Sequence, residues 1–127
     1  MKLTIDRKRW GFGNKGGSLL NGEGKMCCLG FFALQCGYTR KDIFDKGTPL
    51  DIFNGKDIMT IKELSSDTKA NKLKPLISSN RIANNSTCTL LITANDSTST
   101  LYHNPVKREN RIKELFKRIG VAVKFIN

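Results

Sequence analysis

Residues 24–37 constrain the fold of this chain more than any other segment. They read Gly-Lys-Met-Cys-Cys-Leu-Gly-Phe-Phe-Ala-Leu-Gln-Cys-Gly, and they hold three of the four cysteines. Their apolar side chains recur at intervals of three and four residues, which is the spacing of one face of a helix. Gly37 follows where a left-handed helix cap belongs. The segment therefore predicts a buried helix over residues 26–36.

The two ends of the chain are predicted to be strands. Residues 1–6 alternate apolar and polar side chains, as a half-buried strand does. Asn104 and Pro105 have the pattern of a helix start, an N-cap followed by proline at the first helical position. That helix is expected to end before Gly120, and residues 121–125 then have the β-branched character of a strand.

The order of these elements predicts an α+β fold. We expect a small sheet that includes the N- and C-terminal strands, covered by two main helices at residues 26–36 and 105–119. At 127 residues, the chain is expected to form a single domain over 1–127. The predicted core residues are Leu29, Phe32, Ala33, Ile112, Leu115, Phe116 and Ile119 from the helices, and Leu3, Ile5, Val121 and Val123 from the strands.

The middle of the chain has weaker signals. Thr39 is expected to cap a short helix over residues 40–44, and residues 61–64 predict another short helix. Residues 65–86 are rich in Ser, Asn, Lys and Thr and predict a loop, anchored by Leu76 and Ile77. Residues 87–93 have strand composition, although a short helix ended by Asn95 fits the same residues.

The chain is strongly basic, with 22 Lys and Arg against 11 Asp and Glu, a net charge of +11. Residues 1–15 carry five bases and one acid, and residues 104–127 carry seven bases and two acids, so the two ends hold nine of these net charges. Such a field attracts nucleic acids, nucleotides and acidic protein surfaces. The alternative is that the lysines only keep the protein in solution.

Basic and aromatic residues interleave near the N-terminus. Arg7, Arg9, Trp10 and Lys15 flank or lie in a glycine-rich loop over residues 11–18 that lacks the Walker phosphate-binding pattern. A base stacked on Trp10 between these cations is one route to nucleotide binding. The other interpretation is an ordinary loop with Trp10 folded onto the core.

The second helix is predicted to carry a basic stripe beside its apolar face. Glu109 precedes Lys113 by four residues, and Glu114 precedes Arg118 by four, so the alternative is that these bases are paired within a solvated helix face. The residues of the predicted stripe are Lys107, Arg111 and Arg118.

The cysteines do not have the spacing of a metal site. Zinc sites take four ligands, usually from paired cysteines two to four residues apart, whereas Cys27 and Cys28 are adjacent and Cys88 is remote. A catalytic thiol needs a nearby base, and His103 is the single histidine. We therefore expect buried thiols, with no metal, no catalytic residues and no cofactor.

The sequence over residues 24–31, continued by Cys36 and Gly37, resembles a G-K-x-C-C-L-G motif of small uncharacterised accessory proteins of tailed phages and prophages. The resemblance extends to Asn95-Asp96 after an apolar segment, then to a charged helix and a final short strand. It covers roughly residues 1–38 and 90–126. The resemblance implies a phage origin, in which many small proteins block a host or defence factor or sequester a nucleotide signal.

Together these observations predict a non-enzymatic phage accessory protein that inhibits a host defence factor, of the CRISPR or nucleotide-signalling type, through a basic surface. The expected partner is an acidic host protein or a ribonucleoprotein complex, in the cytoplasm of an infected bacterium. No apolar run approaches the 18 residues of a membrane span, so no membrane partner is expected. A nucleic-acid-binding module is the first alternative, and a thiol- or metal-dependent enzyme is the second.

Overall fold

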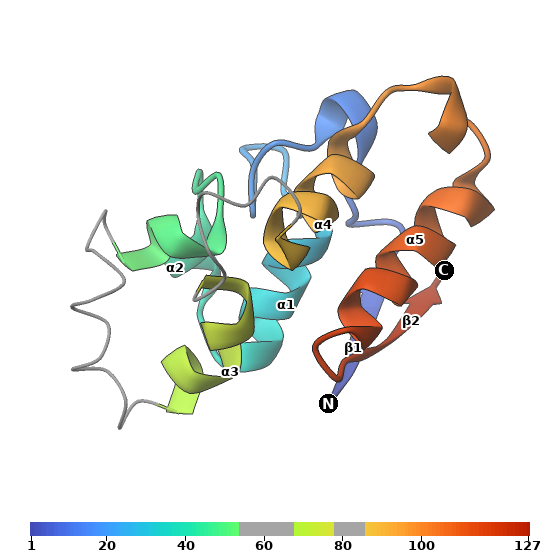
Figure 1. Cartoon of the computed structure of the whole chain (residues 1–127). Helices are drawn as coiled ribbons and strands as arrows, with labels where there is room; N and C mark the ends of the chain where they lie inside the picture. Colours follow the sequence, from blue (N-terminus) through green and yellow to red (C-terminus); the bar gives the residue numbers. More distant parts are fainter. Residues whose placement is uncertain (54–67, 78–85) are drawn as a thin grey trace.

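The computed structural model describes residues 1–53, 68–77 and 86–127 (Figure 1). The predicted helix at residues 61–64 lies outside this part of the chain. The regular elements, in order, are β1 (Lys2–Asp6), η1 (Gly13–Lys15), α1 (Cys28–Cys36), α2 (Arg40–Ile43), η2 (Pro49–Phe53), α3 (Thr68–Ile77), α4 (Thr87–Asp96), η4 (Thr100–Tyr102), α5 (Pro105–Lys117) and β2 (Ala122–Ile126).

The first and last strands pair with each other, as the sequence predicted, and the α+β fold is confirmed. β1 and β2 run parallel, with Lys2 opposite Ala122 and Thr4 opposite Lys124. Side chains alternate between the two faces of a sheet, and those four side chains are all exposed. The sheet therefore has one outer face open to solvent, and its apolar residues lie on the other face.

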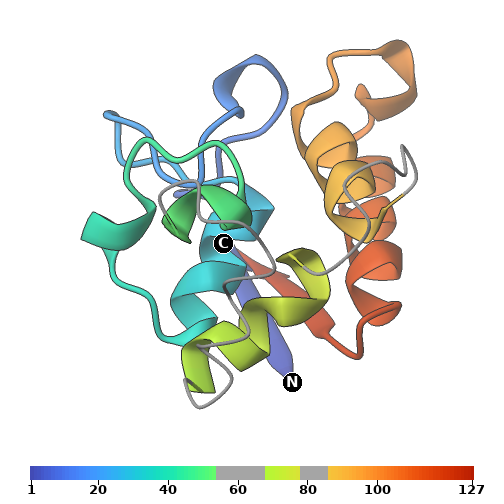
Figure 2. The same ribbon diagram turned by 60° about the vertical axis from the view of Figure 1, so that its left-hand side comes forward.

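Helices α1 and α5 cover this inner face. The contacts place α1 against β1 and α5 against β2. In the view of Figure 2 the strand pair is therefore seen between the two helices. The two helices meet through Phe32 and Phe116, whose ring centres lie 5.5 Å apart. The predicted core is confirmed, except that Ile119 and Val123 are only half-buried.

The glycines of the Gly24–Gly37 segment explain how α1 is placed. A Cβ at Gly30 would overlap the carbonyl oxygen of Leu19, so only glycine allows the helix to lie against that backbone. Gly37 has φ 113° and caps the helix in the left-handed conformation that the sequence predicted. The helix begins at Cys28, two residues later than expected.

The middle of the chain differs from the prediction. The favoured strand at residues 87–93 is wrong, because this segment forms α4, capped by the Ser86 hydroxyl, which accepts a hydrogen bond from the N–H of Thr89. Burial of one helical face outweighs the β-branched composition. Likewise, α3 replaces part of the predicted loop, and its anchors Leu76 and Ile77 are buried as expected.

Candidate functional site

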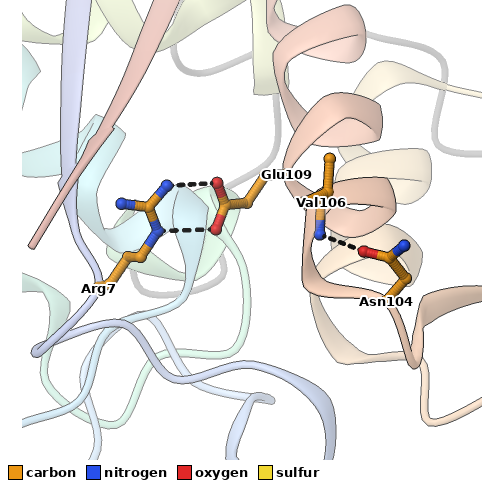
Figure 3. Close-up of polar contacts among 4 residues, drawn as sticks. All are labelled: Arg7, Asn104, Val106 and Glu109. Atoms are coloured by element: carbon orange, nitrogen blue, oxygen red, sulfur yellow. Dashed lines mark hydrogen bonds and ion pairs between the residues drawn. The ribbon is translucent and has the colours of Figure 1, made fainter.

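Arg7 connects the end of β1 to α5. Its Nε and one terminal nitrogen donate to the two carboxylate oxygens of Glu109, at 2.8 and 2.7 Å (Figure 3). Two-pronged pairs of this kind fix geometry more firmly than a single contact, and the Glu109 side chain is only 11% exposed. Arg7, predicted to bind a partner, is therefore already engaged within the fold.

This pair changes the charge pattern of α5. The sequence predicted that Glu109 would pair with Lys113, but Arg7 occupies its carboxylate. Glu114 pairs with Arg118 at 3.7 Å, as predicted, and also with Arg111 at 3.1 Å. Two arginines of the predicted basic stripe thus share one acid, while Lys113 is exposed without an ion pair among the described residues.

Trp10 is not available as a surface anchor. Its side chain is 4% exposed, and its indole N–H donates to Asn95 Oδ1 at 2.8 Å. A large aromatic ring with a satisfied N–H is most stable inside the core, so the second interpretation of this residue is correct. Phe12, which packs against Trp10 at 4.5 Å, is the exposed ring of this loop.

Asn95 is the centre of a buried polar network, which we call the Asn95 hub. Its Oδ1 accepts from Trp10 Nε1 and from the N–H of Cys28, and its Nδ2 donates to the carbonyl of Gly11 and to Asp96 Oδ1. One side chain, 1% exposed, thereby joins the N-terminal loop, the start of α1 and the end of α4. The sequence singled out Asn95 and Asp96 without assigning them a role.

Arg108 completes the hub from α5. Its guanidinium donates three hydrogen bonds to the carbonyls at the end of α4, those of Ala94, Asn95 and Ser97. It also lies 5.3 and 5.2 Å from the ring centres of Phe12 and Tyr102. Burial lowers the pKa of Arg108 from its usual value, yet the carbonyls and rings around it stabilise the cation. Arg108 holds helices together rather than facing a partner.

One set of exposed charges lies on and beside the strand pair. Six cations lie on the outer sheet face, in the turn after β1 and on the side of α5 next to β2. All six are exposed, and none forms an ion pair among the described residues. We call this set the basic surface. Its members are Lys2, Lys8, Arg9, Lys113, Lys117 and Lys124.

Of the predicted binding residues, Arg9 alone belongs to this surface. Lys107 is exposed at the first turn of α5, and Lys15 lies on η1, which packs against α4. The sequence did not identify Lys113 and Lys117. The sequence pattern could have indicated them. On a helix drawn at 3.6 residues per turn, Lys113 and Lys117 flank the apolar face on the side opposite Lys107.

Three of the four cysteines are buried thiols, and Cys88 is half-buried. Cys28 and Cys36 lie in the core, as expected, and all four cysteines are free. Burial raises the pKa of Cys27 to about 12 and that of Cys88 to about 11, so neither is a thiolate at neutral pH. Within residues 1–53, 68–77 and 86–127, no three His, Cys, Asp or Glu side chains are grouped to hold a metal ion.

Comparison of the chain with protein-family models, with curated proteins and with solved structures finds no match. None of the helices in the described part of the chain combines the length and apolar character that crossing a bilayer requires.

Proposed function

We propose that this protein acts by binding, and that its basic surface docks on a partner rich in carboxylates. The observation that carries this proposal is a contrast in ion pairing. Arg7, Arg111 and Arg118 pair with the acids of α5, whereas Lys113 and Lys117 have no ion pair among the described residues. Unpaired cations on one side of a protein with net charge +11 steer an acidic partner to that side.

The resemblance to tailed-phage accessory proteins supplies the biological setting of the proposal. In that setting the partner is an acidic host protein or ribonucleoprotein complex of a defence system, of the CRISPR or nucleotide-signalling type, in the cytoplasm of an infected bacterium. Blocking such a factor needs an interface and no chemical step, which agrees with thiols held in the protonated form by burial.

The binding proposal is tested by charge reversal with a matched control. Lys113→Glu, Lys117→Glu and Lys124→Glu together should abolish binding to immobilised polyglutamate at low salt, and wild-type binding should fall steeply towards 0.15 M salt, where the Debye length is about 8 Å. The control variant reverses three exposed lysines of α2 and α3, with the same change in net charge. Its members are Lys41, Lys72 and Lys74. Equal loss in both variants would mean that only net charge matters.

The defence proposal is tested in cells. Expression of the wild-type protein in bacteria that carry a CRISPR or cyclic-nucleotide defence system should raise the plating efficiency of a phage which that system restricts. The triple reversal at Lys113, Lys117 and Lys124 should not. Unchanged plating in both systems would contradict the inhibitor role and leave the binding result standing.

A nucleic-acid-binding module is the alternative favoured by one observation. The ring of Phe12 is exposed and lies three residues before the cation Lys15 in the sequence. Base stacking on an exposed ring beside a cation is a route to single-stranded nucleic acid. A mobility shift with random single-stranded DNA and RNA decides between the two. Binding that Phe12→Ala weakens and the triple lysine reversal leaves unchanged would favour this alternative.

A further inference from the structure

The edge of β2 that faces away from β1 has backbone N–H and C=O groups without a partner among the described residues. The N–H of Ala122 donates to the carbonyl of Met1, and the carbonyl of Ile126 accepts from the residue that follows β1. Because alternate residues of a strand face opposite edges, the N–H and C=O groups of Val123 and Phe125 point to the other edge. Such an edge is a template for a further strand.

A groove lies between α5 and the start of β2. It has a volume of about 400 Å³, and its walls are Lys113 and Lys117 of α5 and the backbone segment Gly120–Val123. None of these residues belongs to β1, which occupies the opposite edge of β2. Of β2, it contacts Ala122 and Val123, so the first outward-facing residue of the free edge lies at the groove.

The charge of the groove selects its occupant. Lys113 and Lys117 stand on one wall, Lys124 is exposed on the outer face of β2, and no carboxylate is among the lining residues. Two copies of this chain would bring these lysines together, and like charges placed opposite each other are destabilising. An acidic segment is complementary to the same three cations.

We propose that the free edge of β2 receives an extended acidic segment of a partner protein as a third strand. This inference rests on the proposed function and specifies how the partner binds. Lys113 and Lys117 are one helical turn apart, about 6 Å along the axis, and side chains at alternate strand positions are about 6.6 Å apart. Carboxylates at every second residue of the segment therefore match the two lysines.

The edge also distinguishes a peptide from a nucleic acid. Val123 and Phe125 each present a donor and an acceptor, and a peptide backbone in strand conformation satisfies both in turn. A phosphate backbone only accepts hydrogen bonds, so it would leave the two carbonyls without partners.

The test uses two synthetic peptides of equal length and charge. One is a heptapeptide that alternates Glu and Thr, and the other has the same composition with its glutamates consecutive. The alternating peptide should bind the full-length protein more tightly, and should slow hydrogen exchange of the Val123 and Phe125 amides roughly tenfold at saturation. The block peptide should leave these two amides unchanged.

Two variants locate the contact. Val123→Pro removes one outward N–H and leaves the hydrogen bonds of Ala122 to β1. The alternating peptide should then bind no more tightly than the block peptide. Thr4→Pro is the matched control, because it removes an outward N–H from the free edge of β1 instead. If Val123→Pro does not fold, Lys113→Gln with Lys117→Gln tests the same preference without changing the backbone.

Each outcome separates the two proposals. Equal binding of both peptides without protection of Val123 and Phe125 overturns the third strand and leaves binding through the basic surface intact. No binding of either peptide at low salt overturns both. Tighter binding of a random single-stranded oligonucleotide, with protection of the same amides, overturns the choice of a protein partner.

Discussion

The Asn95 hub and the basic surface use charged and polar side chains in opposite ways. In the hub, Arg108 is 4% exposed and donates three hydrogen bonds, and Asn95 makes four. On the basic surface, Lys113 and Lys117 are exposed and without ion pairs among the described residues. Position in the fold, and not residue type, therefore decides which polar groups hold the molecule together and which can meet a partner.

The largest loss of stability is expected from a substitution in the Asn95 hub. Asn95→Ala would leave Trp10 Nε1, the N–H of Cys28 and the carbonyl of Gly11 without partners, and each buried unsatisfied group costs about 1–3 kcal/mol. The free energy of unfolding, measured with urea, should fall by about 3 kcal/mol or more. The exposed Asn110→Ala is the control and should change it by less than about 0.5 kcal/mol. A small loss at Asn95 would mean that the hub is not a stabilising network.

A smaller loss of stability is expected from a substitution where the Asn95 hub contacts the glycine-rich loop. A Cβ at Gly16 would overlap the carboxylate of Asp96, whereas a Cβ at Gly22 meets nothing within 4 Å. Gly16→Ala should lower the free energy of unfolding by about 1–3 kcal/mol, as overpacking does. Equal melting temperatures for Gly16→Ala and Gly22→Ala would show that Asp96 moves aside freely.

The buried thiols predict an alkaline loss of stability. Cys27 ionises near its ordinary pKa of 9.0 in the unfolded chain, while burial raises its pKa to about 12 in the folded one. Between these values the unfolded state binds fewer protons, so stability falls as pH rises, by about 1.4 kcal/mol per pH unit for each such thiol. Urea titrations at rising pH should show this slope, and Cys27→Ala should make it shallower. An unchanged slope would contradict the burial of Cys27.

The smallest effect on stability is expected at the basic surface. Lys113→Gln with Lys117→Gln removes two exposed charges that stabilise no described acid, so the free energy of unfolding should change by less than about 0.5 kcal/mol. Binding to polyglutamate should nevertheless weaken. A large loss of stability with unchanged binding would reverse the distinction between the two regions.

Sequence periodicity predicted the parts of the fold where pattern and burial agree. The two end strands, α1 with its Gly37 cap, and α5 with its Asn104 cap follow from the side-chain pattern of each segment alone. The segment that forms α4 could not be decided in this way, because its composition favours a strand and its helix is stabilised by contacts with α5 and the hub.

The site was less predictable, since pairing depends on distant residues. Arg7 and Glu109 are far apart in the sequence. Because they form an ion pair, Glu109 does not pair with Lys113. Local spacing favoured Glu109 with Lys113 instead. The burial of Trp10 depends in the same way on Asn95, a residue near the other end of the chain.

The pairing of β1 with β2 also determines when the fold can form during synthesis. Residues 2 and 122 become neighbours, and closing a loop of that length costs about 4 kcal/mol of chain entropy. The ribosome must therefore release the chain as far as β2 before the sheet exists, and contacts this distant in sequence slow folding. A product that terminates before residue 122 would lack the partner strand of β1, so a nascent chain gains its sheet only after β2 has been synthesised.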